Sequence, residues 1–361
     1  MAEGKQIGIQ VCAYKDGERV VDTWAGTMGP NDPRPVSPDT LFFSWSTTKG
    51  VAATLVHILA DRGLIDYDAP VASYWPGFAR NGKEKITLAQ VLSHRSGLHR
   101  VPVPHTIDSL TDWDAWVKAL ERSAPAYPPG TRVGYQAYTV GFIIGEVVRL
   151  VTGKSIGKLV QEEIALPLCV DREMYIGVPP GVEDRLATLK IWDMPRELEE
   201  NGVRLPTDCE QFKAMPNDMW QHMNDIRVRR AEIPGANGHF TARALAKMYS
   251  SLTNGENSMR LVSTERVLEM QRLVTDDYDT VLEARTRKGL GYFLGGKVDG
   301  VVGVLGSSST AFGHPGAGGS VAYADPSTRL SVAVTLNKMA QEPPGAGRTQ
   351  EICDTIREEL A

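Results

Sequence analysis

The sequence predicts an α+β fold, in which an antiparallel sheet is flanked by helices and joined to a mainly helical lobe. Three observations carry this prediction. Strand-like segments lie near both ends of the chain, the signals between them are mainly helical, and a terminal helix closes the chain. We expect the N-terminal and C-terminal strands to pair in one sheet, with the first and last helices packed on it.

The first element is a predicted hairpin. Residues 7–14 and 19–24 are strand-like, and Asp16-Gly17 between them is a typical two-residue turn. A short apolar run at 41–45 then leads into a helix that should end near Gly63.

The middle of the chain, to about residue 240, reads as helices broken by Pro/Gly loops. A helix is predicted at 241–252 and a terminal helix at 348–360. Between them lie three strand candidates, at 289–294, 320–324 and 330–336.

We expect one domain over residues 1–361, which is long enough for two lobes that share one site. The order of the elements places an α/β lobe at about 1–85 and 240–361. A helical lobe would occupy about 86–239.

Composition and charge exclude several classes of protein. A formal charge of -5 argues against a nucleic-acid surface, and no apolar run approaches the ~20 residues that span a bilayer. The N-terminus has no basic-then-apolar signal, so we expect a cytoplasmic protein. Four cysteines without a C-x-x-C pair and seven histidines without ligand spacing predict no metal and no disulfide framework. We expect no cofactor, and the oligomeric state is left open.

The most informative motif is Ser46-Thr47-Thr48-Lys49, where the apolar run becomes a helix. Lys49 would lie one turn along on the same face as Ser46, within reach of its hydroxyl. A hydroxyl needs an adjacent base to act as a nucleophile, and a lysine can be that base if burial lowers its pKa. The start of a helix also directs backbone N–H groups toward a developing oxyanion.

A second serine competes for this role. Ser155 and Lys158 also fit S-x-x-K, and the residues around Ser155 fit the G-x-S-x-G elbow. The preceding segment has helical rather than strand periodicity, however. Gly153 is then expected to be a helix C-cap, and Ser155 the N-cap of the next helix.

Two further segments lie where such a site would need them. Tyr135 is at a loop-to-helix junction, from which a phenol can reach a cleft; Tyr138 is a competing candidate, and either could simply fill space. Near the C-terminus, His314-Pro315-Gly316-Ala317-Gly318-Gly319-Ser320 precedes an apolar strand. Small residues there would let a substrate approach the backbone, although a plain Gly-rich turn is the alternative.

In this order the three motifs resemble the serine β-lactamase and penicillin-binding-protein superfamily. The nearest branch is class C-like and includes family VIII carboxylesterases and related acyltransferases. The resemblance covers nearly the whole chain and implies a β-lactamase/transpeptidase-like fold. Its further blocks are Gln90–Leu98, Pro129-Gly130-Thr131 and Ala236-Asn237-Gly238-His239.

The resemblance implies a role for each matching residue. Ser46 is similar to the acylated nucleophile, Lys49 to its base partner, and Tyr135 to the tyrosine that shuttles protons. Gly316 and Ala317 would border the substrate, and the Ala317 N–H would join that of Ser46 in the oxyanion hole.

Departures from the family's pattern bear on the substrate. Tyr135-Gln136-Ala137 replaces Tyr-x-Asn, which removes an amide that would bind a β-lactam side chain. His314 replaces the lysine of Lys-Thr-Gly, so the positive charge that would meet a β-lactam carboxylate is weakened. His314 would then contact substrate rather than attack it.

We therefore expect a serine hydrolase, a carboxylesterase acting on small or medium esters through a Ser46 acyl-enzyme. The alternative is an acyltransferase or transesterase of secondary metabolism with an alcohol or amine acceptor. A β-lactamase, a D-amino-acid peptidase and a non-catalytic penicillin-recognition module are disfavoured. The expected partners are small molecules, with no nucleic acid and no membrane.

The segment from about 170 to 230 resembles the family least and is rich in Met and Trp. It could form an apolar rim for a bulky substrate, or its methionines could simply face the core. The residues concerned are Met174, Trp192, Met194, Met215, Met219, Trp220 and Met223.

Overall fold

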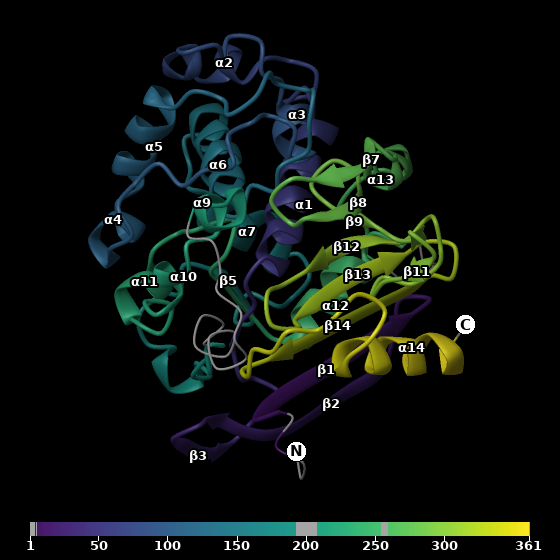
Figure 1. Ribbon diagram of the computed structural model, residues 1–361. Coiled ribbons are helices and arrows are strands. Elements are labelled where there is room, and N and C mark those ends of the chain that lie inside the picture. Colours follow the sequence, from purple (N-terminus) through teal and green to yellow (C-terminus); the bar gives the residue numbers. More distant parts are fainter. Residues whose placement is uncertain (1–3, 5, 193–207, 254–258, 361) are drawn as a thin grey trace.

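The computed structural model describes residues 4, 6–192, 208–253 and 259–360. Its main element is a nine-stranded antiparallel sheet with the order β3-β2-β1-β14-β13-β12-β9-β8-β7 (Figure 1). The strands are β1 (Gly8–Lys15), β2 (Glu18–Gly29), β3 (Asp32–Pro35), β7 (Thr275–Asp279), β8 (Ala284–Lys288), β9 (Phe293–Leu294), β12 (Phe312–Pro315), β13 (Val321–Asp325) and β14 (Leu330–Leu336). The α+β class and the antiparallel sheet are thereby confirmed.

The two ends of the chain meet in the middle of this sheet. β1 pairs with β14, and Val11 lies opposite Val334. The predicted hairpin forms from β1 and β2, and its turn residues Asp16 and Gly17 both have positive φ, 52° and 85°. That geometry is the one a two-residue hairpin turn requires, which explains the Asp-Gly pair.

The other strands of the described residues form two smaller sheets. One has the order β4-β6-β5 and the other is the hairpin β10-β11. Their bounds are β4 (Phe42–Phe43), β5 (Met174–Ile176), β6 (Gly238–Phe240), β10 (Lys297–Val298) and β11 (Val301–Val302).

Helices cover both faces of the large sheet, and the others gather beside it (Figure 1). Their bounds are α1 (Thr47–Asp61), α2 (Val71–Tyr74), α3 (Leu88–Leu92), α4 (Ile107–Thr111), α5 (Trp113–Arg122), α6 (Thr139–Thr152), α7 (Ile156–Val160), α9 (Glu210–Ala214), α10 (Asn217–Trp220), α11 (Ile226–Arg230), α12 (Ala242–Ser250), α13 (Thr264–Gln271) and α14 (Arg348–Leu360).

β14 shows how side-chain alternation separates the two faces. Val332 and Val334 join the apolar cluster that includes Cys353 of α14. On the other face, Ser331 donates a hydrogen bond to the Ala246 carbonyl of α12. Alternate residues of a strand point to opposite faces, so this strand is packed on both sides.

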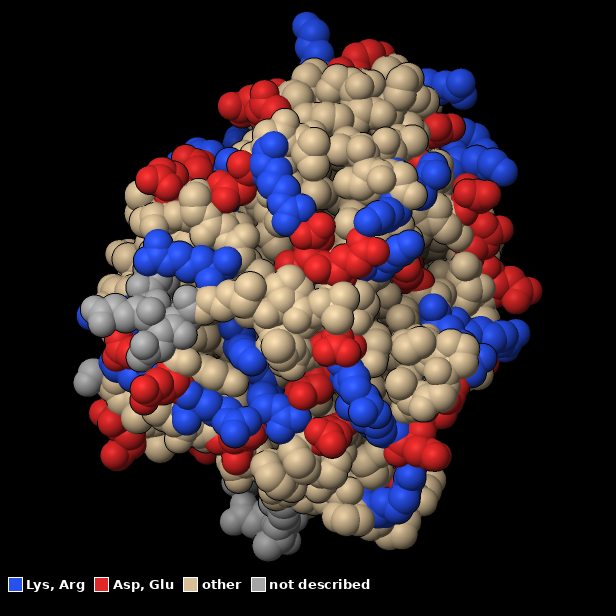
Figure 2. All heavy atoms as spheres, turned by 180° about the vertical axis from the view of Figure 1, so that it is seen from behind, with Lys and Arg blue, Asp and Glu red and all other residues tan. Residues whose placement is uncertain are grey.

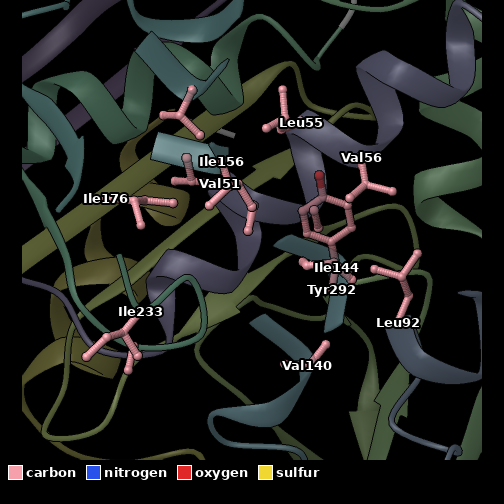
Figure 3. Close-up of a cluster of buried hydrophobic side chains, with 14 of the residues drawn as sticks. Val51, Leu55, Val56, Leu92, Val140, Ile144, Ile156, Ile176, Ile233 and Tyr292 are labelled. Atoms are coloured by element: carbon pink, nitrogen blue, oxygen red, sulfur yellow. The ribbon is translucent and has the colours of Figure 1, made fainter. Parts of the chain in front are cut away.

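α1 lies at the centre of the main core. Figure 3 shows side chains of α1, among them Val51 and Leu55, surrounded by residues from α3, α6, α7 and β5. Every residue of α1 from Thr47 to Ala60 is buried. The helix that carries the candidate nucleophile is therefore held on all sides, which fixes the position of its first turn.

The predictions for the C-terminal half succeed for some elements and fail for others. The terminal helix and the strand at 330–336 form as predicted. The strand expected at 289–294 is wrong except for its last two residues, because the chain turns at Gly291 (φ 87°), where a Cβ would lie 2.4 Å from that of Ala53. The sequence does not predict β7 and β8, since charged residues dominate both the edge strand β7 and its neighbour β8.

Charges of both signs are interspersed over the face shown in Figure 2. Among the described residues, no helix is long and apolar enough to cross a membrane. The cytoplasmic location and the two-lobe division remain predictions.

Candidate active site

Ser46 lies in the tight turn between β4 and α1. It is the N-cap residue of α1 and is half-buried, whereas its neighbours on both sides are buried. The residue before it, Trp45, has a φ of 46°, which is unusual for a residue other than glycine. The Trp45 ring packs 5.0 Å from that of Phe43 and 5.2 Å from that of Trp220. These contacts hold a turn that directs Ser46 away from the core.

Lys49 lies one turn along α1 and points back to Ser46. Its Nζ is 2.9 Å from Ser46 Oγ, 2.7 Å from the Ala137 carbonyl oxygen and 2.6 Å from the Gly235 carbonyl oxygen. The side chain is buried, and this burial lowers the pKa of Lys49 well below the usual value for lysine.

These three contacts suit a neutral amine. A neutral lysine has two N–H bonds and one lone pair, and the two carbonyls, which can only accept, take the two N–H bonds. The lone pair then faces the Ser46 hydroxyl. Lys49 can therefore accept the Ser46 proton without breaking its other hydrogen bonds.

Tyr135 is the third member of the group. Lys49 Nζ lies 4.9 Å from the centre of the Tyr135 ring, and the side chain is 5% exposed. Burial raises the pKa of Tyr135, and a side-chain hydrogen bond to Ser46 lowers that pKa by a smaller amount. The phenol is thus protonated at rest and lies beside the Ser46–Lys49 pair.

The end of β12 comes close to the Ser46 turn. A Cβ on Gly316 would lie 2.5 Å from the Ser44 carbonyl oxygen and 3.0 Å from Thr47 Oγ1, so only glycine allows this approach. The Ser320 hydroxyl donates to the same Ser44 carbonyl at 2.9 Å. Sequence reasoning placed Gly316 at the site, and the structure supplies the steric reason.

The backbone amides of Ser46 and Ala317 are available as donors. Within the described part of the chain, neither N–H donates a hydrogen bond to another protein group. Ala317 is half-buried, one residue after Gly316. Backbone N–H groups without a protein acceptor can together form an oxyanion hole.

His314 is buried behind this edge and is neutral. Its Nδ1 lies 2.7 Å from the Pro315 carbonyl oxygen, which can only accept, so Nδ1 carries the proton and Nε2 the lone pair. Burial lowers the pKa of His314 well below its usual value. The ring packs against Phe293 and Tyr135, with centres 5.0 Å and 6.2 Å apart.

The competing motif is a helix cap, as predicted. The Ser155 hydroxyl accepts from the Lys158 N–H and donates to Glu232 at 2.6 Å. Gly153 ends α6 in the left-handed conformation, with φ 72°. Capping of α7 therefore accounts for Ser155 without a catalytic role.

In the Met/Trp-rich segment, some residues pack in the core and others border a groove, so each interpretation applies to part of it. Met174, Met219 and Met223 are fully buried in the core, while Trp192 and Trp220 line a large groove. Met194 lies outside the described residues.

Sequence reasoning missed the two carbonyls that hold Lys49. They belong to Ala137 and Gly235, which are 88 and 186 residues from Lys49 in the chain. A backbone oxygen carries no residue-type signal, so no motif could have revealed them.

The fold and the geometry of the site define the class of protein: an enzyme that uses a serine for hydrolysis or acyl transfer. The model of the family described as Beta-lactamase matches residues 1–355. The chain therefore belongs to the Beta-lactamase family.

Three similar proteins span nearly the whole chain. The esterase/β-lactamase LipL of Mycobacterium tuberculosis (strain ATCC 25618 / H37Rv) is 35% identical over 358 residues, covering 94% of this chain and 79% of LipL. The structure of a family VIII carboxylesterase is 37% identical, with a TM-score of 0.86, and covers 98% of this chain and 92% of that one. A penicillin-binding-protein homologue from Caulobacter crescentus is 32% identical, with a TM-score of 0.87, and the coverage is 100% and 94%.

Proposed function

We propose that this protein is a serine carboxylesterase that forms an acyl-enzyme on Ser46. The observation that carries the proposal is the contact of buried Lys49 Nζ with Ser46 Oγ at 2.9 Å, beside two carbonyl oxygens that take its other hydrogen bonds. The esterases among the similar proteins support the same activity.

Acylation follows from this arrangement. Lys49 accepts the proton of Ser46 as Oγ attacks the ester carbonyl carbon, and the developing oxyanion binds to the N–H groups of Ser46 and Ala317. The proton then passes through the Tyr135 hydroxyl to the alcohol oxygen, the C–O bond breaks, and the alcohol leaves. Deacylation reverses these steps, with water in place of the alcohol.

An alcohol or amine in place of water would make the same enzyme a transferase. The steps and the residues would be unchanged, because the acceptor would lose its proton through Tyr135 as water does. The ratio of transfer product to free acid, measured with increasing acceptor concentration, separates the two activities.

A β-lactam fits this site less well than an ester. The Gln136 amide is buried and held by Ser96 and Thr139, so it does not take the place of the missing asparagine. His314 is neutral, so it offers a substrate carboxylate no fixed positive charge.

The substrate side of the proposal concerns a groove of about 860 Å³ whose lining includes Pro315, Gly316 and Ala317, and Gly316 lies against the turn that carries Ser46. We propose that it receives the apolar part of the ester. Its walls are mainly apolar and include Leu282, Phe293, Val298, Leu305 and Met339.

Three of the charged residues that line the groove, Arg285, Arg287 and Glu342, are held in ion pairs. Arg285 and Arg287 both bind Asp276, at 2.8 Å and 3.0 Å, and Glu342 binds Arg348 at 2.6 Å. Two large apolar side chains, by contrast, are exposed among the lining residues: Tyr278 and Val301, at 59% and 42%. Exposed apolar residues beside an apolar groove favour an uncharged, hydrophobic ligand group.

Activity is expected to rise with acyl chain length from acetate to about octanoate. Burying one methylene is worth about 0.8 kcal/mol, or roughly fourfold in kcat/KM per carbon at most. Val301→Arg should flatten this series for p-nitrophenyl esters and leave acetate hydrolysis unchanged. Val20→Arg, at an equally exposed valine of β2, is the matched control. A flat series in the unmodified protein would refute the groove assignment.

Mass spectrometry of the intact protein tests the function itself. A fluorophosphonate and a p-nitrophenyl ester should each add one group, and peptide mapping should locate it on Ser46. An adduct on Ser155 would favour the elbow mechanism, and a folded protein without any adduct would favour a binding role.

A further inference from the structure

The loop that carries Tyr135 is fixed by distant residues rather than by regular structure. Three consecutive backbone N–H groups each donate to such a residue. Gly134 donates to the His94 carbonyl at 3.0 Å, Tyr135 to Asp279 Oδ1 at 3.1 Å, and Gln136 to His94 Nδ1 at 3.0 Å. The central amide, that of Tyr135 itself, thus depends on a carboxylate 144 residues away in the chain.

Both carboxylate oxygens of Asp279 accept hydrogen bonds, and the side chain is fully buried. Its Oδ1 also accepts from the N–H groups of Val281 and Leu282, at 2.9 Å and 3.0 Å. Its Oδ2 accepts from Lys288 Nζ at 2.7 Å, and the two side chains are 0% and 1% exposed. Asp279 ends β7 and Lys288 ends β8, so one hairpin at the edge of the large sheet supplies both charges.

The ion pair is in contact with the site through one ring. Lys288 Nζ lies 5.1 Å from the centre of the Phe293 ring, and that ring packs on both His314 and Tyr135. A buried ion pair gives little stability over well-packed apolar residues of similar volume, because both charges lose their hydration. Folding alone therefore gives no reason to bury a charged pair here, while the nearby Tyr135 does.

We propose that Asp279 and Lys288 are positioning residues for Tyr135: the Asp279 carboxylate fixes the tyrosine's backbone, and the two opposite charges set the balance of proton transfer around Ser46. The proposal rests on the role given above to Tyr135. It makes neither residue catalytic, since neither contacts Ser46.

Several titratable groups face this pair from other elements. They are His94 and His99 of the loop after α3, Tyr127, Tyr135, and His314 of β12. The Asp279 charge raises the pKa of Tyr135, and the Lys288 charge lowers the pKa of both His94 and His314. Each pKa changes in the expected direction, because a nearby negative charge favours the protonated form of a group and a nearby positive charge favours its deprotonated form.

Two single variants should therefore shift the pH profile in opposite directions. Asp279→Asn removes the negative charge, so the apparent pKa values of kcat/KM should fall; Lys288→Met removes the positive charge, so they should rise. The shift should be up to roughly one pH unit in each case. Ester hydrolysis followed by titrimetry measures it without a pH-dependent chromophore. A role in packing alone would lower activity at every pH and leave both profiles in place, which would overturn the proposal.

Two neutral double variants test the backbone contact, and they remain informative if a single variant fails to fold. Asp279→Asn/Lys288→Met keeps an oxygen acceptor for the Tyr135 N–H without either charge, and its kcat should stay within about threefold of the parent. Asp279→Ala/Lys288→Met removes the acceptor, and kcat should fall at least about tenfold further, with little change in KM. Equal kcat values in the two double variants would contradict the positioning role.

A control variant and a labelling experiment separate the possible failures. Glu146→Gln disrupts another buried carboxylate, which binds Arg149 and the Trp113 ring N–H, and should destabilise the protein without shifting the profile. Fluorophosphonate labelling of Ser46 should persist in all these variants. Labelled variants with unshifted profiles would refute only the positioning role, whereas an unlabelled parent protein would refute the acyl-enzyme itself.

Discussion

Ser46→Ala is expected to abolish turnover while the fold survives. Without Oγ no acyl-enzyme can form, and kcat should fall on the order of 10⁴- to 10⁶-fold, the usual range for loss of a nucleophile. The Ser46 side chain makes no cap hydrogen bond to α1, so stability should change by only about 1 kcal/mol, for the lost contact with Lys49. Ester hydrolysis and thermal unfolding of the same preparation measure the two effects.

Ser155→Ala is the matched control and should show the reverse. It removes the cap of α7 and a hydrogen bond to Glu232, so the free energy of unfolding should fall by about 1–2 kcal/mol. Activity below the melting transition should remain that of the parent. An inactive Ser155→Ala protein beside an active Ser46→Ala protein would reverse the assignment.

Tyr135→Phe should lower kcat by roughly 10²- to 10⁴-fold, the range for a lost proton-transfer group. The ring contacts with His94 and His314 are retained by phenylalanine, and only the hydroxyl is removed. Loss of proton delivery to the leaving alcohol should affect esters of poorly acidic alcohols more than p-nitrophenyl esters. Comparison of an ethyl ester with a p-nitrophenyl ester of the same acid tests this difference.

Tyr138→Phe provides the comparison for that result. Tyr138 is equally buried but packs beside Trp116, with ring centres 6.4 Å apart, and its removal should leave kcat within a few-fold of the parent. Near-parental turnover of Tyr135→Phe with a large loss in Tyr138→Phe would transfer the proton-transfer role to Tyr138.

How far the sequence predicts the structure depends on how local each feature is. Ser46 and Lys49 lie within one helical turn, so their contact follows from helix geometry, and the cap role of Ser155 follows from the Gly153 stop signal. The strand at 330–336 and the helix at 348–360 carry patterns within their own length. The Asp16-Gly17 hairpin is predicted for the same reason.

Features built by contacts between distant segments were not predictable. The polar inward face of β7 and β8 reads as a charged surface segment, because nothing in its pattern shows that Asp279 and Lys288 bury one another. The carbonyl of Gly235 reaches Lys49 only after the chain has folded. The loop-to-helix junction singled out Tyr135 but left Tyr138 as a competitor, and the proton-transfer role of Tyr135 came only from the resemblance to a family.

The left-handed Trp45 has a consequence for how activity is lost. A tryptophan in this conformation is disfavoured by about 1–2 kcal/mol relative to its usual backbone, so the turn before Ser46 does not form by its own preference. The turn is kept by the rings of Phe43 and Trp220, which pack against Trp45, and Trp220 ends α10. Inactivation by heat or mild denaturant therefore need not wait for the sheet to melt. If α10 alone separates from the core, the turn before Ser46 can relax, and the enzyme is inactive while its sheet is still folded.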